Sequence, residues 1–240
     1  MLKKYFSYLY DKTAEKSSNC LFSLLEPNKN ASLMDCGCWD GENTKKYANA
    51  VNAKHVYGIE IDRQKSKEAS AKGVIVRTAD LNKKIPYKDN SFDVIIAYHV
   101  IEHLVNVRLF VSEIHRTLKK GGYVLIGTPN LASWHNVGAL ALGLQPFSGP
   151  TIMPNHQSEI GFVTEINQAR MKKVFSKNCD ALNHVKVMTC RELCCLLKSF
   201  KFNIENTAGF GYHPFPGFIA SFLSKIDPWH SHYIIVKARK

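Results

Sequence analysis

The sequence predicts an α/β protein whose strands form one doubly wound sheet. Strand-like and helix-like segments alternate along most of the chain, and this order is typical of parallel strands joined by covering helices. Residues 92–98 (FDVIIAY) form a continuous apolar run, as expected for a strand that is covered on both faces. Ligands of such sheets bind at the carboxyl ends of the strands. The residues that directly follow each strand are therefore the candidates for function.

The first half of the chain contains five predicted strands and the helices between them. The strands are expected at residues 31–36, 55–61, 73–77, 92–98 and 123–128, and the helices at 42–52, 64–72 and 107–118. The third helix is followed by Lys119-Lys120-Gly121-Gly122, and lysines and then glycines are common where helices end.

The C-terminal part supplies one more helix and two strands. Thr189 and Glu192 have the spacing of a capping box, which predicts a helix over 189–200. Strands at 202–207 and 232–237 are expected to close the sheet as an antiparallel pair. Residues 214–228 carry apolar side chains at helical spacing, and we expect a helix that covers the sheet or the acceptor pocket. Contact with a lipid-like substrate or a membrane surface is the alternative for this segment.

The segments between residues 130 and 183 are less specific. Residues 130–147 are interpreted as a helix and a lid, and 148–183 as an insertion with a basic stretch at 170–177. A solvated helix face explains that basic stretch better than a contact with nucleic acid. We expect a single domain over 1–240, with an N-terminal helical segment at 1–30 and a lid or insertion at 131–183.

Composition is typical of a soluble protein of the cytoplasm. The 240 residues are 45% hydrophobic and 22% charged, with a net charge of +12. No apolar run is long enough to span a bilayer, and the N-terminus lacks the apolar region of a secretory signal. The seven cysteines include no CxxC pair, which predicts reduced thiols.

The glycine turn in LMDCGCWDG, residues 33–41, indicates the kind of ligand. A dinucleotide-binding turn has the spacing G-x-G-x-x-G, but here Trp39 and Glu42 occupy the second and third glycine positions. A carboxylate at Glu42, in the first turn of the next helix, would repel a phosphate. The ligand expected is therefore a nucleoside without phosphates.

Two later carboxylates fit such a nucleoside. Glu60 ends the second strand nineteen residues after Gly41, where its carboxylate can accept both ribose hydroxyls. Asp80 and Leu81 follow the third strand and would place an acceptor and an apolar side chain beside an adenine.

These motifs resemble those of class I S-adenosylmethionine-dependent methyltransferases, in particular the type 11 or ubiquinone-type O-methyltransferases. The resemblance covers residues 31–130 and includes LMDCGCWDG, VYGIEID, FDVIIAYHVIEH and LKKGGYVLIGTPN. It implies a Rossmann-like sheet of seven strands, mostly parallel with an antiparallel C-terminal strand. It also implies S-adenosylmethionine as the cofactor. Trp39 departs from the family pattern, which most often has glycine there.

The resemblance also assigns cofactor-binding residues. Asp35, Gly37 and Gly41 would hold the methionine part, Glu60 the ribose, and Asp80 with Leu81 the adenine. Ile61 and Tyr98 complete the predicted cofactor site.

Three histidines are the predicted catalytic residues. His99 and His103 follow the fourth strand, and His184 begins HVKVMTCREL, which is similar to a segment in several branches of the family. We expect them to position the acceptor or remove its proton. No metal ligands are predicted in this interpretation.

An alternative comes from the resemblance to small-RNA 2′-O-methyltransferases, where two glutamates and two histidines hold a divalent metal. Glu102, His103 and His184 match three of those positions, while His99 replaces a glutamate. That replacement removes a hard oxygen donor and disfavours magnesium.

The function expected is O-methylation of a small or amphipathic metabolite. Metal-assisted methylation of RNA is the first alternative, and a non-catalytic subunit that binds S-adenosylmethionine is the second. The expected partner is a small-molecule acceptor, with nucleic acid less favoured.

Overall fold

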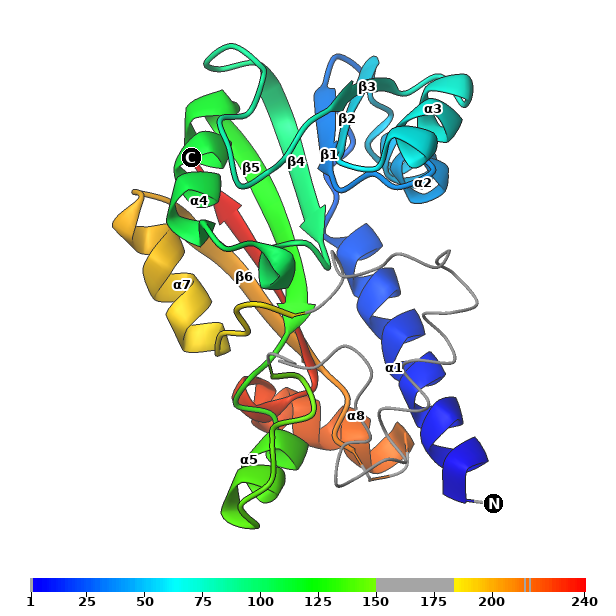
Figure 1. Ribbon diagram of the computed structural model, residues 1–240, viewed down its shortest axis with the longest axis vertical. Coiled ribbons are helices and arrows are strands. Elements are labelled where there is room, and N and C mark those ends of the chain that lie inside the picture. The colour runs from blue at the N-terminus through cyan, green and yellow to red at the C-terminus, as the bar shows by residue number, and fades with distance from the viewer. Residues whose placement is uncertain (1, 150–183, 214, 216) are drawn as a thin grey trace.

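The computed structural model describes residues 2–149, 184–213, 215 and 217–240. Its centre is a seven-stranded sheet with the order β3-β2-β1-β4-β5-β7-β6 (Figure 1). The strands are β1 Ser32–Cys36, β2 His55–Glu60, β3 Ile75–Thr78, β4 Phe92–Tyr98, β5 Leu118–Pro129, β6 Asn203–Phe210 and β7 Tyr233–Arg239. The predicted doubly wound fold is confirmed.

The order of the strands places the glycine turn at the centre of the sheet. β1 pairs in parallel with β2 on one side and with β4 on the other. The chain therefore reverses its direction of winding between β1 and β4, and ligands of open α/β sheets bind at such a switch point.

The C-terminal strand runs against the rest of the sheet, as predicted. β7 pairs antiparallel with β5 and with β6. It is buried along nearly its whole length, because it lies between two strands and under helices.

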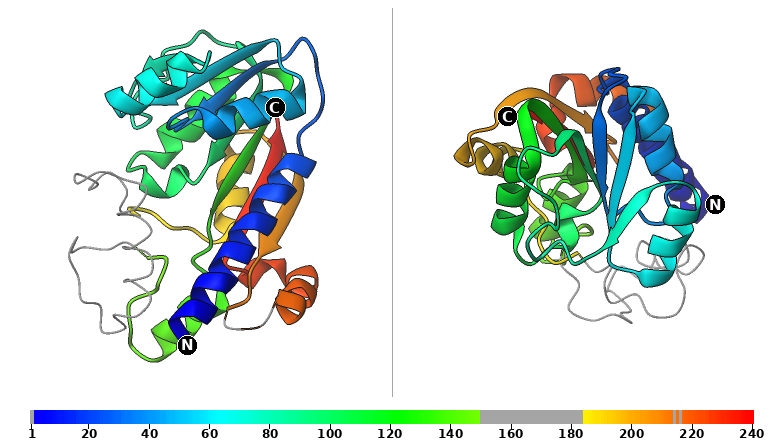
Figure 2. Two further views of the ribbon diagram at one scale, coloured as in Figure 1. Left: turned by 90° about the vertical axis from the view of Figure 1, so that its right-hand side faces the viewer. Right: turned by 90° about the horizontal axis from the view of Figure 1, so that it is seen from above.

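Helices cover both faces of the sheet (Figure 2). The α-helices are α1 Leu2–Ser23, α2 Glu42–Val51, α3 Arg63–Ala71, α4 Val107–Thr117, α5 Trp134–Ala141, α7 Cys190–Ser199 and α8 Gly217–Ile226, and the short 3-10 helices are η1 Ile101–His103 and η3 Pro228–His230. Leu21 of α1 and Tyr47 of α2 pack on one face of the sheet. Phe110 of α4 and Leu193 of α7 pack on the other.

Helix starts follow the local sequence. Thr189 accepts a hydrogen bond from the backbone N–H of Glu192 at 3.1 Å and so caps α7, as the capping-box spacing predicts. Asp62 caps α3 in the same way, through the N–H of Lys65.

The start of β5 differs from the prediction. The strand begins at Leu118 and includes Lys119-Lys120-Gly121-Gly122, which were expected to separate a helix from a later strand. Two contacts explain the difference. Lys119 forms an ion pair with Asp93 at 2.7 Å, and Gly121 and Gly122 exchange backbone hydrogen bonds with Lys240.

The helix expected within residues 214–228 forms as α8, but its most apolar side chains do not pack on the sheet. That this helix lines the acceptor pocket stays a prediction. Phe218, Phe222 and Ile226 are exposed, and α8 has no fully buried residue. Most of the expected lid or insertion, including the basic stretch 170–177, lies outside the described residues. Among the residues that are described, none of the helices is long and apolar enough to cross a membrane.

Candidate functional site

The turn between β1 and α2 depends on two glycines. Gly37 and Gly41 have φ values of +71° and +78°, a region that favours glycine. A Cβ atom at Gly37 would lie 2.8 Å from Val100, and one at Gly41 would lie 2.9 Å from the backbone of Ala69. The turn can therefore follow this path, and the chain segments around it can approach closely, only with glycine at both positions.

Glu60 holds this turn against the end of β2. Its carboxylate is almost fully buried and accepts hydrogen bonds from the backbone N–H groups of Trp39 and Asp62, both at 2.9 Å. Each carboxylate oxygen can accept more than one hydrogen bond. Glu60 is therefore able to support the turn and still accept the hydroxyls of a ribose.

Trp39 adopts the left-handed conformation, with φ of +49°. This conformation costs free energy for a bulky residue, which explains why glycine suits this position in the family pattern. The Trp39 ring lies against α3, with Lys65 Nζ 5.0 Å from its centroid.

Asp35 lies at the end of β1 and is buried. Its carboxylate accepts a hydrogen bond from the Thr44 hydroxyl of α2 at 2.5 Å. Burial raises the pKa of Asp35 to about 7, partly offset by the Thr44 hydrogen bond and reinforced by the charge of Glu60. A cationic ligand beside it would favour the ionised carboxylate.

The residues predicted for the adenine follow β2 and β3. Asp80 accepts two hydrogen bonds from Asn82 through Oδ1, and among the described residues its Oδ2 has no partner. Leu81 is buried, whereas Ile61 exposes its side chain at the end of β2. A free carboxylate oxygen and an exposed apolar side chain are suitable groups for an adenine. The carboxylate acceptors and apolar side chains at this edge of the sheet therefore fit the nucleoside of S-adenosylmethionine.

Tyr98 is held toward the N-terminal helix. Its hydroxyl donates a hydrogen bond to Ser17 of α1 at 2.9 Å, and its ring packs on Gly127. Tyr98 therefore links β4 to α1, and its role in cofactor binding stays a prediction.

His99 and Glu102 form a hydrogen-bonded pair after β4. His99 Nδ1 lies 3.1 Å from Glu102 Oε1, and the Thr128 hydroxyl donates to Glu102 Oε2 at 3.0 Å. Glu102 is fully buried, while His99 exposes about a third of its side chain (33%). Burial raises the pKa of Glu102, but the hydrogen bond and charge of His99 and the charges of two further imidazoles lower it more, so its net pKa shift is downward.

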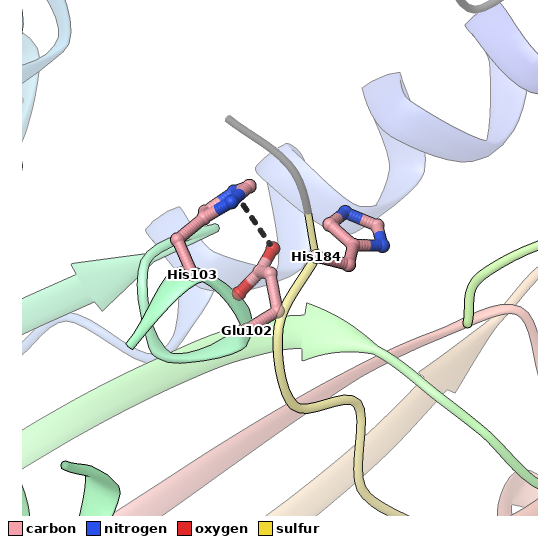
Figure 3. Close-up of side chains that lie close together, drawn as sticks. All are labelled: Glu102, His103 and His184. Carbon is pink, nitrogen blue, oxygen red and sulfur yellow. Dashed lines mark ion pairs between the residues drawn. The ribbon is translucent and has the colours of Figure 1, made fainter. Parts of the chain in front are cut away.

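His103 and His184 also lie close to Glu102 (Figure 3). His103 Nε2 lies 4.0 Å from Glu102 Oε1, and the two imidazole centroids are 5.3 Å apart. The backbone N–H groups of Val185 and Lys186 donate to the Glu102 carbonyl, which holds the His184 segment against η1. One ligand atom from each of Glu102, His103 and His184 lies within 4.8 Å of the others. All three predicted catalytic histidines therefore gather around one carboxylate.

His184 is oriented by the chain near α5. Its Nδ1 lies 2.9 Å from the carbonyl oxygen of Ser148. A carbonyl only accepts hydrogen bonds, so Nδ1 carries the proton and a neutral ring keeps an unprotonated Nε2. That nitrogen can ligate a metal or accept a proton.

Sequence reasoning missed a second group of histidines. His135 lies in the first turn of α5, His213 follows β6, and His232 precedes β7. His232 Nδ1 lies 3.0 Å from His135 Nε2, and the His213 and His232 rings are 4.9 Å apart. Burial lowers the pKa of His135 to about 3 and that of His213 to about 4. No local spacing connects these three residues, because each comes from a different part of the chain.

Thr128 was also missed as a site residue, and Glu102 was considered only as a metal ligand. The strand order could have indicated Thr128. β4 and β5 are parallel neighbours with Tyr98 opposite Gly127, so Thr128 near the end of β5 and the residues after β4 lie at the same edge of the sheet.

Comparison with known proteins shows which family the first half of the chain resembles. Residues 34–126 match a protein family described as "Methyltransferase domain". A probable S-adenosylmethionine-dependent methyltransferase of Mycolicibacterium smegmatis is 34% identical over 100 residues, which cover 41% of this chain and 38% of that protein. An uncharacterized protein of Methanocaldococcus jannaschii is 30% identical over 118 residues, covering 49% and 56% of the two chains.

The fold is shared with solved structures at lower sequence identity. An S-adenosylmethionine-dependent methyltransferase from Mesorhizobium loti superposes with a TM-score of 0.61 at 16% identity, covering 92% of this chain and 96% of that one. The curated relatives match over about half of their own length or less, so the match concerns only part of each protein. Residues 34–126 are therefore similar to a methyltransferase domain, and the relatives of known name that match this part are probable S-adenosylmethionine-dependent methyltransferases.

Proposed function

We propose that this protein transfers the methyl group of S-adenosylmethionine to a hydroxyl of a small or amphipathic metabolite in the cytoplasm. The glycine turn, Glu60 and Asp80 support the cofactor side of this proposal. Their geometry offers acceptors for the ribose and adenine and leaves no room for side chains at the two turn glycines.

The observation that carries the proposal is the hydrogen-bonded pair of His99 and Glu102. S-adenosylmethionine supplies an activated methyl group, so the protein needs to align the acceptor and remove its proton. An ionised Glu102 keeps the proton of His99 on Nδ1 and stabilises the imidazolium that forms when Nε2 takes a second proton. This arrangement suits a hydroxyl acceptor.

A methyl-transfer assay tests the proposal. The purified protein is offered labelled S-adenosylmethionine with small phenolic, glycosidic and amphipathic hydroxyl acceptors, and with small amines as a comparison. Methylation of at least one hydroxyl acceptor, reduced in His99→Gln, is the expected result. Tight cofactor binding with no turnover on any acceptor would favour the non-catalytic subunit instead.

A second candidate function is supported by the group Glu102, His103 and His184. Their ligand atoms lie within 4.8 Å of one another, and the hydrogen bond from His184 Nδ1 to Ser148 keeps Nε2 available for a metal. A divalent ion held there would assist methylation of a ribose 2′-hydroxyl of RNA. Loss of turnover with EDTA, restored by manganese and seen only with short RNA 3′ ends, would replace the small-molecule proposal with this one.

A further inference from the structure

Two helices at one end of the molecule expose apolar side chains. Phe218, Phe222 and Ile226 project from α8, and Phe218 exposes 77% of its surface. Leu140 of α5 and Leu142 just after it are also exposed. Figure 1 shows α5 and α8 at the same end of the molecule, beyond the carboxyl ends of β4 and β5. Large groups of exposed apolar side chains often mark a surface that binds a partner or a membrane.

The start of α5 contacts the residues that directly follow α8. The Trp134 ring at the start of α5 stacks on His230 of η3 with centroids 4.6 Å apart, and its Nε1 donates to Asp227 at 3.3 Å. Tyr212 donates a hydrogen bond to the Asp227 carbonyl. We call the exposed side chains of Trp134, Leu140, Leu142, Phe215, Phe218, Phe222 and Ile226 the α5–α8 surface. The side-chain contacts of Trp134 therefore connect the α5 part of this surface with the residues after α8.

The α5–α8 surface is bordered by basic groups. Neither α5 nor α8 contains a carboxylate, and Lys225 is exposed one turn from Phe222. Lys16 of α1 donates to the carbonyl of Gly217 at 3.3 Å, at the start of α8, and to the hydroxyl of Ser221 in the middle of this helix. Asp227, which directly follows α8, has its Oδ2 2.8 Å from His230 Nδ1. The charge beside the apolar side chains is therefore positive.

We propose that the α5–α8 surface binds the surface of an anionic lipid bilayer. Exposed aromatic and aliphatic side chains with neighbouring lysines are the combination that favours the interface of an anionic membrane. A second copy of this chain would bring the same lysines together on a chain whose net charge is already +12. The helices would lie on the bilayer, because none of those described is long and apolar enough to span it.

This orientation has a consequence for the acceptor, which rests on the proposed function. The candidate site follows β4 and β5, and their carboxyl ends point toward the end of the molecule that carries α5 and α8 (Figure 1). In a protein bound through this surface, the candidate site after β4 and β5 would therefore face the bilayer. The acceptor class inferred is a hydroxylated amphiphile that resides in the membrane.

Vesicle co-sedimentation of the full chain tests the binding without any need for activity. Vesicles of phosphatidylcholine with 30% phosphatidylglycerol are compared with pure phosphatidylcholine at low and physiological salt. We expect binding to the anionic vesicles that weakens with salt. The double variant Phe218→Ser/Phe222→Ser should reduce the partition coefficient at least about tenfold, and Lys225→Glu about fivefold or more.

Matched variants on the opposite part of the molecule serve as controls. Ile75→Ser replaces an exposed apolar residue on β3, and Lys67→Glu reverses an exposed lysine on α3. Both should bind vesicles like the wild type. Absence of binding to anionic vesicles at low salt, or equal binding by the double variant, would overturn the proposal. A lipid-free dimer that dissociates in the double variant, with no vesicle binding, would identify a second copy as the occupant and also overturn it.

Discussion

His99 Nδ1 lies 3.1 Å from Glu102 Oε1, and this is the contact that orients an imidazole at the edge of the sheet. Glu102 is itself fixed, because Thr128 donates to its second oxygen from β5. The pair therefore joins the ends of two neighbouring strands. A neutral imidazole held in this way keeps its proton on Nδ1 and leaves Nε2 unprotonated.

The first prediction concerns His99. Replacing it with glutamine should lower kcat about 100-fold, the lower range for loss of a general base. The dissociation constant for S-adenosylmethionine should stay within about twofold of the wild-type value, because His99 is not among the predicted cofactor ligands. Single-turnover methyl transfer and calorimetry measure the two quantities.

His115→Gln is the matched control for this variant, since His115 lies on α4 against Phe202. It should change neither quantity. Unaltered kcat in His99→Gln would contradict the role of the pair.

The second prediction concerns a divalent metal. In the small-molecule account His103 and His184 position the acceptor, so turnover should survive EDTA. His184→Ala should then raise KM for the acceptor more than it lowers kcat. Abolition of turnover by EDTA, with cofactor binding unchanged and activity restored by manganese, would contradict this account and support the RNA alternative.

The third prediction concerns Asp35 and pH. Burial raises its pKa to about 7, while the methionine part of the cofactor is cationic and favours the ionised carboxylate. Affinity for S-adenosylmethionine should therefore fall about tenfold between pH 8 and pH 6, as Asp35 becomes protonated. Calorimetry over this range measures the midpoint.

Two variants of the same contact sharpen this test. Asp35→Asn should remove the pH dependence, because the side chain no longer ionises. Thr44→Val should move the midpoint to higher pH, since the Thr44 hydrogen bond lowers the pKa of Asp35. A wild-type affinity that is flat from pH 6 to pH 8 would exclude Asp35 from the cofactor site.

The fourth prediction concerns the buried histidines His135 and His213. Burial lowers their pKa values to about 3 and about 4, below the ordinary value of 6.5. The unfolded chain therefore binds more protons below pH 6.5, and the folded state loses stability as the pH falls toward 4. We expect the free energy of unfolding to fall by about 5 kcal/mol over this window.

Urea unfolding followed by circular dichroism at pH 7, 5.5 and 4.5 measures this loss. His213→Gln should show a smaller decrease than the wild type, whereas His55→Gln, at an exposed position on β2, should show the same decrease. Identical curves for wild type and His213→Gln would contradict the assignment.

The fold was largely predictable from the sequence because its strands are marked by apolar runs and turn residues. The seven strands, the α7 cap at Thr189 and the antiparallel β7 follow from such local signals. The start of β5 was missed, since its pairing with Asp93 and Lys240 is formed by residues distant in sequence. Local propensity gives no information about such contacts.

The candidate site was predictable where it follows strand ends. Glu60, His99 and His103 come directly after β2 and β4 or end them. The contact of Glu60 with the Trp39 N–H and the meeting of His135 with His232 were not predictable, because each joins separate elements through a particular backbone path. The exposure of Phe218 on α8 was also missed, as helical spacing shows which residues share a face and not what covers that face.

The most direct test of the central claim is calorimetric titration of the protein with S-adenosylmethionine and its demethylated product. The account predicts one site for each ligand and no binding of NAD. Glu60→Ala should lose about 1.5–3 kcal/mol of binding free energy, the range for hydrogen bonds to a charged group, while Glu68→Ala on α3 should bind like the wild type. Failure of the wild type to bind either ligand, or unchanged affinity in Glu60→Ala, would contradict the claim that this edge of the sheet is an S-adenosylmethionine site.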